Sequence, residues 1–451
     1  MIRLCLTRPR TTVAMLVLLS SAALAGCETL DQFITPGNKD RIKGERVSVL
    51  TSDQSVEPDP KLHDTKVVLP APFVNPDWPQ PGGYADNVMH HLSAPGELKE
   101  IWSSSVGSGS STDARLTASP VIADGKIFAL DANANVGAYD EKSGAQLWRV
   151  DLTPVDLDSE KGFGGGVAYD SGKLYVSTGF GFVAALDAAS GKELWRHSVT
   201  VPFRAAPVVN GGRVFVATQE NQLYALAADD GRVLWDHRGI AESAGILGSN
   251  SVAVAGDVVI VPYTSGELFA LRVQNGKPIW SDTLSRTGKL TPLASLADIS
   301  GRPVIDRGLV FANSHAGRLV AIDIRTGERA WTLDVGGTQR PWVAGDYVFV
   351  ITDEAKVLCV ARADGRVRWS TQLDAYRNPE TRKGPIAWAG PVLVSDRLIA
   401  VSSGGYAVSI SPYTGEVLGK VDTPDKAFIA PIVADNTVYV LTDDARLTAL
   451  R

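Results

Sequence analysis

The chain has 451 residues, of which 44% are hydrophobic and 21% charged, and its formal net charge at pH 7 is −6. This composition supplies ample apolar material for a large core. The acidic balance argues against a nucleic-acid-binding protein, which needs a basic face to displace counterions from phosphates. With only three cysteines in the chain, a disulfide framework is excluded.

Residues 1–26 have the pattern of a secretory signal peptide. Three arginines precede an apolar stretch over 13–24 that is too short for an ordinary membrane span. The stretch ends in Leu24-Ala25-Gly26-Cys27, which resembles the lipobox of bacterial lipoproteins. The resemblance implies cleavage before Cys27 and acylation of its thiol by lipid chains such as palmitate, which anchor a protein durably. The alternative is an incidental cysteine beside an ordinary cleavage site.

Residues 27–95 are predicted to be the lipidated Cys27 followed by an extended tether, because the region is polar and rich in proline. Two stretches differ from the rest of this linker. Residues 44–50 are either a docking strand or ordinary linker, and residues 78–83 are predicted to form a strap laid on the domain that follows. His90 and His91 are expected to be solvated.

From residue 96 onward the chain repeats one pattern of apolar runs and turns. Six copies end in Gly, three further residues and Trp, at Gly144–Trp148, Gly191–Trp195, Gly231–Trp235, Gly276–Trp280, Gly327–Trp331 and Gly365–Trp369. A seventh copy keeps the glycine at Gly415 but has Gly419 in place of Trp. The copies lie about 40 to 50 residues apart, the range of a four-stranded propeller blade. The glycine supplies the positive φ that a hairpin turn needs, and the Trp is predicted to pack between adjacent blades.

Each copy predicts four short antiparallel strands, because its runs are rich in β-branched and aromatic residues and are bounded by Gly, Asn or Asp. The last copy, over 430–450, supplies only three strands. Residues 98–102, by contrast, form a strand ending in Trp that has no blade before it. We therefore predict an all-β fold, an eight-bladed β-propeller over 96–451, whose last blade is completed by the N-terminal strand.

The sequence nominates no catalytic group. The six histidines lack metal-ligand spacing, and no Gly-x-Ser-x-Gly elbow occurs. The glycine-rich run at 162–166 lacks the Gly-Lys-Ser/Thr that grips phosphate, so close backbone packing is its expected role. Cys359 lies in a strand-like run and is expected to be a small core residue. We predict no enzymatic activity, no cofactor and no metal.

The repeat, as in residues 185–195, closely resembles that of pyrroloquinoline-quinone-dependent alcohol dehydrogenases, over 98–451. That resemblance implies the fold and not the function. Many of those enzymes carry an adjacent cysteine pair beside the cofactor, which this chain lacks. A lipobox followed by a tether and such a propeller resembles the BamB family of lipoproteins, and residues 44–50 look like a segment of its α-proteobacterial members. The second resemblance implies a non-enzymatic scaffold of the outer-membrane β-barrel assembly complex, which assists assembly and insertion of outer-membrane proteins.

The same resemblance implies where the protein lies and what it binds. Glu28, rather than Asp, follows Cys27, which favours lipid anchoring at the periplasmic face of the outer membrane. The implied partners are the periplasmic polypeptide-transport-associated domains of the BamA barrel subunit and the other subunits of the complex. Unfolded strands of outer-membrane proteins are a further candidate, by strand addition at a blade edge.

In the BamB family, part of the BamA contact uses a Leu-x-Leu-Arg stretch and an Asp-x-Asp stretch. Here these match Val201, Phe203 and Arg204, and Asp298, with Ser300 in place of the second acid. An exposed Arg beside an apolar residue is the usual composition of an interface anchor. The alternative is that Arg204 is a solvated loop residue and Phe203 fills a gap between blades.

Two other functions remain open from the sequence. A quinoprotein dehydrogenase would explain the repeat, and its mark would be a quinone absorption band or alcohol oxidation after reconstitution. A lipoprotein that binds another periplasmic protein or a cell-wall component would copurify with that partner instead of the assembly complex.

Overall fold

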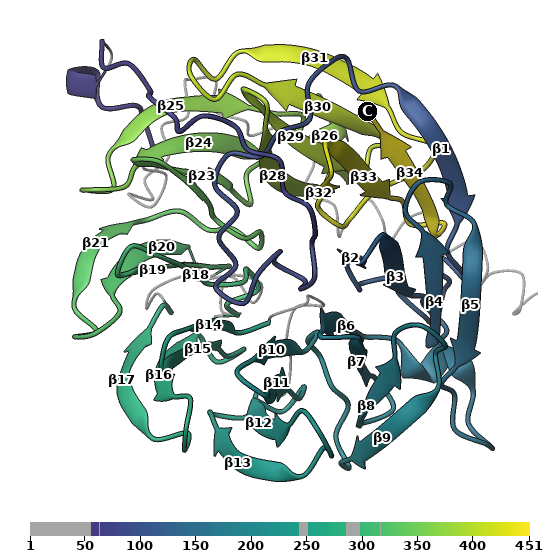
Figure 1. Cartoon of the computed structure of the whole chain (residues 1–451). Helices are drawn as coiled ribbons and strands as arrows, with labels where there is room; N and C mark the ends of the chain where they lie inside the picture. The colour runs from purple at the N-terminus through teal and green to yellow at the C-terminus, as the bar shows by residue number, and fades with distance from the viewer. Residues whose placement is uncertain (1–55, 63, 243–250, 286–297, 316) are drawn as a thin grey trace, which may run out of the picture. The chain divides into compact units, whose positions relative to one another are not determined.

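The computed structural model of the chain describes residues 56–451 apart from 63, 243–250, 286–297 and 316, and Val56–Arg451 form one compact unit. Eight four-stranded antiparallel sheets follow one another around a ring (Figure 1), which confirms the predicted eight-bladed β-propeller. The helices among the described residues are two 3₁₀ turns, η1 (Pro60–Leu62) and η2 (Ser159–Gly162). Neither has the length and apolar character needed to cross a membrane.

Consecutive strands pair within each blade, and the first strand of a blade is the innermost. Blades 1 and 2 consist of β2 (Val121–Ala123), β3 (Lys126–Leu130), β4 (Asn135–Asp140), β5 (Gln146–Asp151), and β6 (Gly165–Asp170), β7 (Lys173–Thr178), β8 (Phe182–Asp187), β9 (Glu193–Ser198). Blades 3 and 4 consist of β10 (Val208–Asn210), β11 (Arg213–Ala217), β12 (Gln222–Ala227), β13 (Val233–Arg238), and β14 (Ala253–Ala255), β15 (Val258–Pro262), β16 (Glu267–Arg272), β17 (Pro278–Thr283).

Blades 5 and 6 consist of β18 (Val304–Asp306), β19 (Leu309–Ser314), β20 (Arg318–Asp323), β21 (Arg329–Leu333), and β22 (Trp342–Ala344), β23 (Tyr347–Ile351), β24 (Lys356–Ala361), β25 (Val367–Gln372). A small hairpin of β26 (Tyr376–Asn378) and β27 (Lys383–Pro385) precedes blade 7, which consists of β28 (Trp388–Val394), β29 (Arg397–Ser402), β30 (Tyr406–Ile410) and β31 (Val417–Asp422).

Blade 8 joins the two ends of the propeller. Its inner three strands are β32 (Ile432–Ala434), β33 (Thr437–Leu441) and β34 (Arg446–Leu450), and its outermost strand is β1 (Glu100–Ser105). β1 pairs antiparallel with β34, with Trp102 opposite Ala449. This confirms the prediction that the N-terminal strand completes the last blade.

The repeated Gly and Trp form one device between neighbouring blades. The indole N–H of Trp195 in blade 2 donates to the carbonyl of Ala228 in blade 3 at 3.1 Å. Gly231, at φ +74°, lies directly on the Trp195 ring, where a Cβ would come within 2.5 Å of Cε3. Equivalent Trp–carbonyl bonds link the other consecutive blades from 8 round to 7. The Trp is therefore an inter-blade residue, as predicted, and the glycine is needed for both its φ and its lack of a side chain.

The interface between blades 7 and 8 lacks this device. Blade 7 has Gly419 where the other blades have Trp, and nothing lies within 4 Å of the position of its missing Cβ. The turn on which such a Trp would pack does not exist in blade 8, because its third and fourth strands belong to opposite ends of the chain. The lost Trp therefore has a structural reason. We call this interface the seam.

Residues 73–93, here called the central strap, run once around the inside of the ring (Figure 1). The two ends of the strap meet, since Phe73 N–H donates to His91 O at 3.0 Å and Ser93 N–H donates to Phe73 O at 2.8 Å. Between them the strap forms hydrogen bonds with every blade in ring order from 8 to 7, at Asp435, Ile122, Tyr169, Val209, Val254, Ile305, Trp342 and Ser395.

Polar side chains of the strap contribute to this pairing and extend it. The Gln80 amide donates to Val209 O at 2.7 Å and accepts from Val209 N–H at 3.0 Å, which mimics a strand pair. Asn87 Nδ2 donates to the carbonyls of Val252 and Pro303 in blades 4 and 5. These side chains are buried, so each bond satisfies a polar group that would otherwise be costly.

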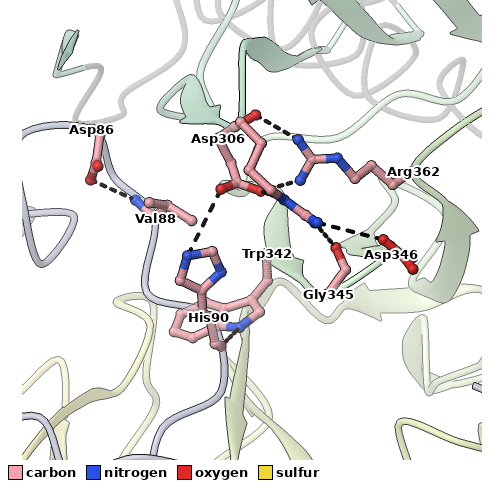
Figure 2. Close-up of polar contacts among 9 residues, drawn as sticks. Asp86, Val88, His90, Asp306, Trp342, Gly345, Asp346 and Arg362 are labelled. Atoms are coloured by element: carbon pink, nitrogen blue, oxygen red, sulfur yellow. Dashed lines mark hydrogen bonds and ion pairs between the residues drawn. The ribbon is translucent and has the colours of Figure 1, made fainter. Parts of the chain in front are cut away.

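Polar contacts link the strap to blades 5 and 6 (Figure 2). His90 Nε2 lies 3.8 Å from Asp306 Oδ1, and the Trp342 indole donates to His90 O at 2.7 Å. Asp306 is buried and also pairs with Arg362, whose Nη2 donates to the Asp306 carbonyl at 2.6 Å. A buried pair of this kind is sensitive to loss of either partner.

The structure of residues 56–95 differs in part from the predicted extended tether. Up to residue 55, the predicted tether over 27–95 lies outside the described residues. Residues 78–83 lie on the blades, as the strap interpretation expected, and Trp78 is buried. The expectation that His91 is solvated was wrong. Its ring is buried, with Nδ1 2.7 Å from Pro70 O and Nε2 accepting from Asp396 N–H at 3.0 Å. A polar side chain in a proline-rich segment is therefore buried here, because it forms hydrogen bonds with backbone groups that are distant in the sequence.

Candidate partner-binding site

The predicted contact residues lie on the links that join one blade to the next. Val201, Phe203 and Arg204 are between β9 and β10, and Asp298 is between β17 and β18. Because each blade has four antiparallel strands, all these links emerge on one face of the propeller, together with the turns between second and third strands. We call it the connecting face.

Phe203 is a core residue and not an exposed anchor. Its side chain is only 1% exposed and packs in the apolar cluster between blades 2 and 3, with its ring centroid 6.3 Å from that of Tyr224. Its backbone pairs with Thr218, which turns the side chain inward. The alternative interpretation, in which Phe203 fills a gap between blades, therefore describes its position.

Arg204 and Asp298 form an ion pair that the sequence did not predict. Arg204 Nη2 lies 2.6 Å from Asp298 Oδ2, and the two side chains are 10% and 1% exposed. Arg204 belongs to the approach to blade 3 and Asp298 to the approach to blade 5, so the pair spans blade 4. The expectation of an exposed Arg204 was wrong, because its guanidinium points to a buried carboxylate. The structure thus brings together two residues that the family resemblance implied from separate stretches of the chain.

Beside Arg204, the predicted residue Val201 is joined at the surface by residues that sequence reasoning missed. Pro202 is exposed, and its carbonyl accepts from Gln219 N–H at 2.9 Å, which places the exposed Gln219 and Glu220 next to it. Ile240, 60% exposed, joins them through a bond from Asn221 Nδ2 to its carbonyl at 2.6 Å. We call Val201, Pro202, Gln219, Glu220 and Ile240 the blade-3 rim. The signal in the sequence that could have identified this surface is Ile240, an apolar residue within a polar link between blades.

Cys27, the predicted lipidation site, lies outside the described residues. Cys359 is buried in β24, as expected for a core residue. Within the described part of the chain, no group of three or more His, Cys, Asp or Glu residues could hold a metal ion.

Comparison with known proteins gives a consistent result. The family model described as outer membrane protein assembly factor BamB matches residues 132–371 and 377–451. The outer membrane protein assembly factor BamB of Salmonella typhimurium is 31% identical over 354 residues, which cover 78% of this chain and 88% of that protein.

Solved structures resemble the propeller as well. The crystal structure of BamB from Moraxella catarrhalis matches with a TM-score of 0.65 and 18% identity, covering 79% of this chain and all of that one. The quinohemoprotein alcohol dehydrogenase of Comamonas testosteroni matches with a TM-score of 0.63 and 15% identity, covering 83% and 80%. At such identities these two likenesses concern the fold alone.

Proposed function

Because the chain belongs to the BamB family of outer membrane protein assembly factors, we propose that it is a non-enzymatic scaffold that binds the periplasmic domains of BamA. The family assignment carries the proposal, and it places the protein in outer-membrane assembly. The scaffold would act by positioning its partner against a rigid disc, without bond chemistry. Its other partners would be the remaining subunits of the complex.

The connecting face supports a contact near Arg204. The blade-3 rim combines an exposed apolar side chain, Ile240, with an exposed proline and a carboxylate, Glu220. Apolar residues bordered by polar ones are the usual composition of a protein interface. The buried pair of Arg204 with Asp298 holds the link beneath this rim, so we assign Arg204 and Asp298 to positioning the surface, with Val201 at its edge.

A calorimetric titration tests the partner. The full chain with Cys27→Ser, purified from the periplasm, is mixed with the purified periplasmic domains of BamA from its own organism. The proposal expects saturable one-to-one binding. Absence of binding by a chain that circular dichroism shows to be folded would refute it. Copurification with a different periplasmic protein would then favour the alternative lipoprotein function.

Matched variants test the site. Ile240→Ser should weaken BamA binding, whereas Val155→Ser, which changes an 89% exposed apolar residue on the link between blades 1 and 2, should not.

Arg204→Glu should also weaken binding, because it places a second acid beside buried Asp298. The double exchange Arg204→Asp with Asp298→Arg restores the pair. Recovery of binding in that variant means a positioning role, and continued loss means that Arg204 itself contacts BamA.

We further propose that Cys27 carries the lipid anchor and that the propeller lies at the periplasmic face of the outer membrane. Membrane fractionation tests this proposal. The wild-type chain and a Cys359→Ser control should both sediment with the outer membrane, and Cys27→Ser should appear in the soluble periplasmic fraction. Sedimentation of Cys27→Ser with the membrane in cells that lack BamA would contradict a lipid anchor, since no partner would then retain it.

A further inference from the structure

A cavity of about 210 Å³ lies inside the ring on the side of the connecting face. Trp78 and Pro81 of the central strap form part of its wall, and the rest comes from the inner strands of blades 1, 5, 6, 7 and 8 or from the links that lead to them. Phe428, which is exposed, is among the lining residues, so the cavity reaches solvent there. The cavity is large enough for a small organic molecule with several times the volume of one water.

The charge of this cavity is opposite to that of the chain. Arg302 and Arg340 both line it, and no acidic residue occurs among the described residues of its wall, although the chain as a whole carries a net charge of −6. Burial lowers the pKa of Arg340 to about 9, with a further lowering from the neighbouring Arg302 and a smaller opposing effect from the carboxylate of Asp86 in the strap. Burial likewise lowers the pKa of Arg302 to about 10. Both guanidiniums remain protonated at neutral pH, and an anion between them would offset the cost of burying two like charges.

Arg340 is held in a fixed position. Its Nη1 donates to the strap carbonyls of Gly82 and Asn87, the latter at 3.2 Å. Its guanidinium lies 4.8 Å from the ring centroid of Trp342 and 5.7 Å from that of Trp78. Such stacking fixes the plane of the guanidinium fork, which is the geometry that recognises a carboxylate by two parallel bonds.

Two further polar groups of the same wall are buried donors. Trp78 Nε1 and Ser300 Oγ have no hydrogen-bond partner among the described residues, and both side chains are buried. An indole N–H can only donate, so it requires an acceptor in the cavity. Unpaired buried donors are rare in native proteins, and here they occur beside two cations.

We propose that this cavity is a binding site for a small organic dianion with two carboxylate groups, held by Arg302 and Arg340 and by the donors of Trp78 and Ser300. The volume favours an organic anion over a single inorganic ion. Two guanidiniums on separate inner-strand approaches favour two carboxylates over one. The inference stands independently of the scaffold function, because none of these residues belongs to the blade-3 rim.

Calorimetry tests the site directly. The full chain with Cys27→Ser is titrated with succinate, with malate and with inorganic phosphate at pH 7.5 in low salt. Succinamide, which has nearly the same shape as succinate without its charge, is the ligand control. We expect saturable binding of at least one dicarboxylate and a raised melting temperature, with no binding of succinamide. Binding of inorganic phosphate alone would overturn the assignment, as would the absence of any saturable binding by a folded chain.

Variants locate the bound anion. Arg302→Gln should weaken dicarboxylate binding by at least about tenfold, because it removes a charge-assisted hydrogen bond. Ser300→Ala, which changes no charge and few contacts, should weaken it by roughly threefold, the cost of one modest neutral hydrogen bond. Arg232→Gln, in the last turn of blade 3, is the matched control and should leave affinity unchanged. Equal affinities in the three folded variants would mean that the anion binds elsewhere, and the proposal would fail.

Discussion

Replacing Gly231 with alanine tests the Gly–Trp device between blades. Gly231 has φ +74°, and an added Cβ would lie 2.5 Å from Trp195 Cε3. Alanine at a left-handed φ costs roughly 1 kcal/mol, and overpacking against a ring held on both sides costs roughly 1 to 3 kcal/mol. We therefore expect Gly231→Ala to lower the free energy of unfolding by about 2 to 4 kcal/mol.

The matched control is Gly172→Ala. Gly172 has φ +80°, yet nothing lies within 4 Å of the position of its Cβ, so this variant carries the backbone cost alone, roughly 1 kcal/mol. Urea unfolding followed by tryptophan fluorescence and circular dichroism gives both values, provided that the slope with urea is unchanged. Equal destabilisation by the two variants would refute the steric argument. In a Trp195→Leu background the cost of Gly231→Ala should fall toward that of Gly172→Ala.

Three further predictions concern buried groups. Gln80→Ala removes both bonds to Val209 and leaves a buried N–H and C=O unpaired, so the free energy of unfolding should fall by about 2 to 4 kcal/mol in urea titrations; no change would mean that water replaces the amide. Burial raises the pKa of the Cys359 thiol, so in a chain whose other cysteines are serine it should react with a thiol reagent only after unfolding. Burial lowers the pKa of His237, which contacts Tyr263 at 2.8 Å, below its ordinary value of 6.5. The unfolded state then binds the extra proton between the two values, so the melting temperature should rise with pH up to about 6.5, and His237→Gln should reduce that rise.

The blades could be predicted because their information is local and repeated. Each Gly-x-x-x-Trp motif specifies a turn and the packing against the next blade. Several copies of the motif therefore predict a propeller, even though one copy has lost its Trp. Closure by residues 98–102 followed from counting strands, and β1 occupies that place. A period of this kind needs no long-range contact to be recognised.

The central strap could be predicted only in part, for the opposite reason. Residues 73–93 have no period, and their prolines, glycines and polar side chains are also the composition of a linker. What orders them is the set of unpaired backbone groups on eight inner strands, which come from sequence positions up to Asp435. Only the short segment at Trp78 was recognised as packing material, because a tryptophan beside glycines is unusual in a tether.

The candidate site was also partly predictable. A motif match selected Arg204 and Asp298, but it could not show that the two are partners, because 94 residues separate them along the chain. The motif match assigned Phe203 to the partner contact and left burial between blades as the alternative, because an apolar residue in a link has no periodicity that would decide its direction. Its pairing with Thr218 decides that direction, and that contact is visible only in the folded blade.

The position of the central strap in the chain determines when its hydrogen bonds can be completed. The strap precedes every blade in the chain, yet one of its bonds is to Asp435, close to the C-terminus, and its two ends meet at the seam between blades 7 and 8. A growing or emerging chain can therefore fold individual blades early, but it cannot complete the strap until the final blade has arrived. The strap is made before the blades, and it completes its pairing after them. A chain truncated before blade 8 would lack the Asp435 N–H that pairs with Asn75 O of the strap.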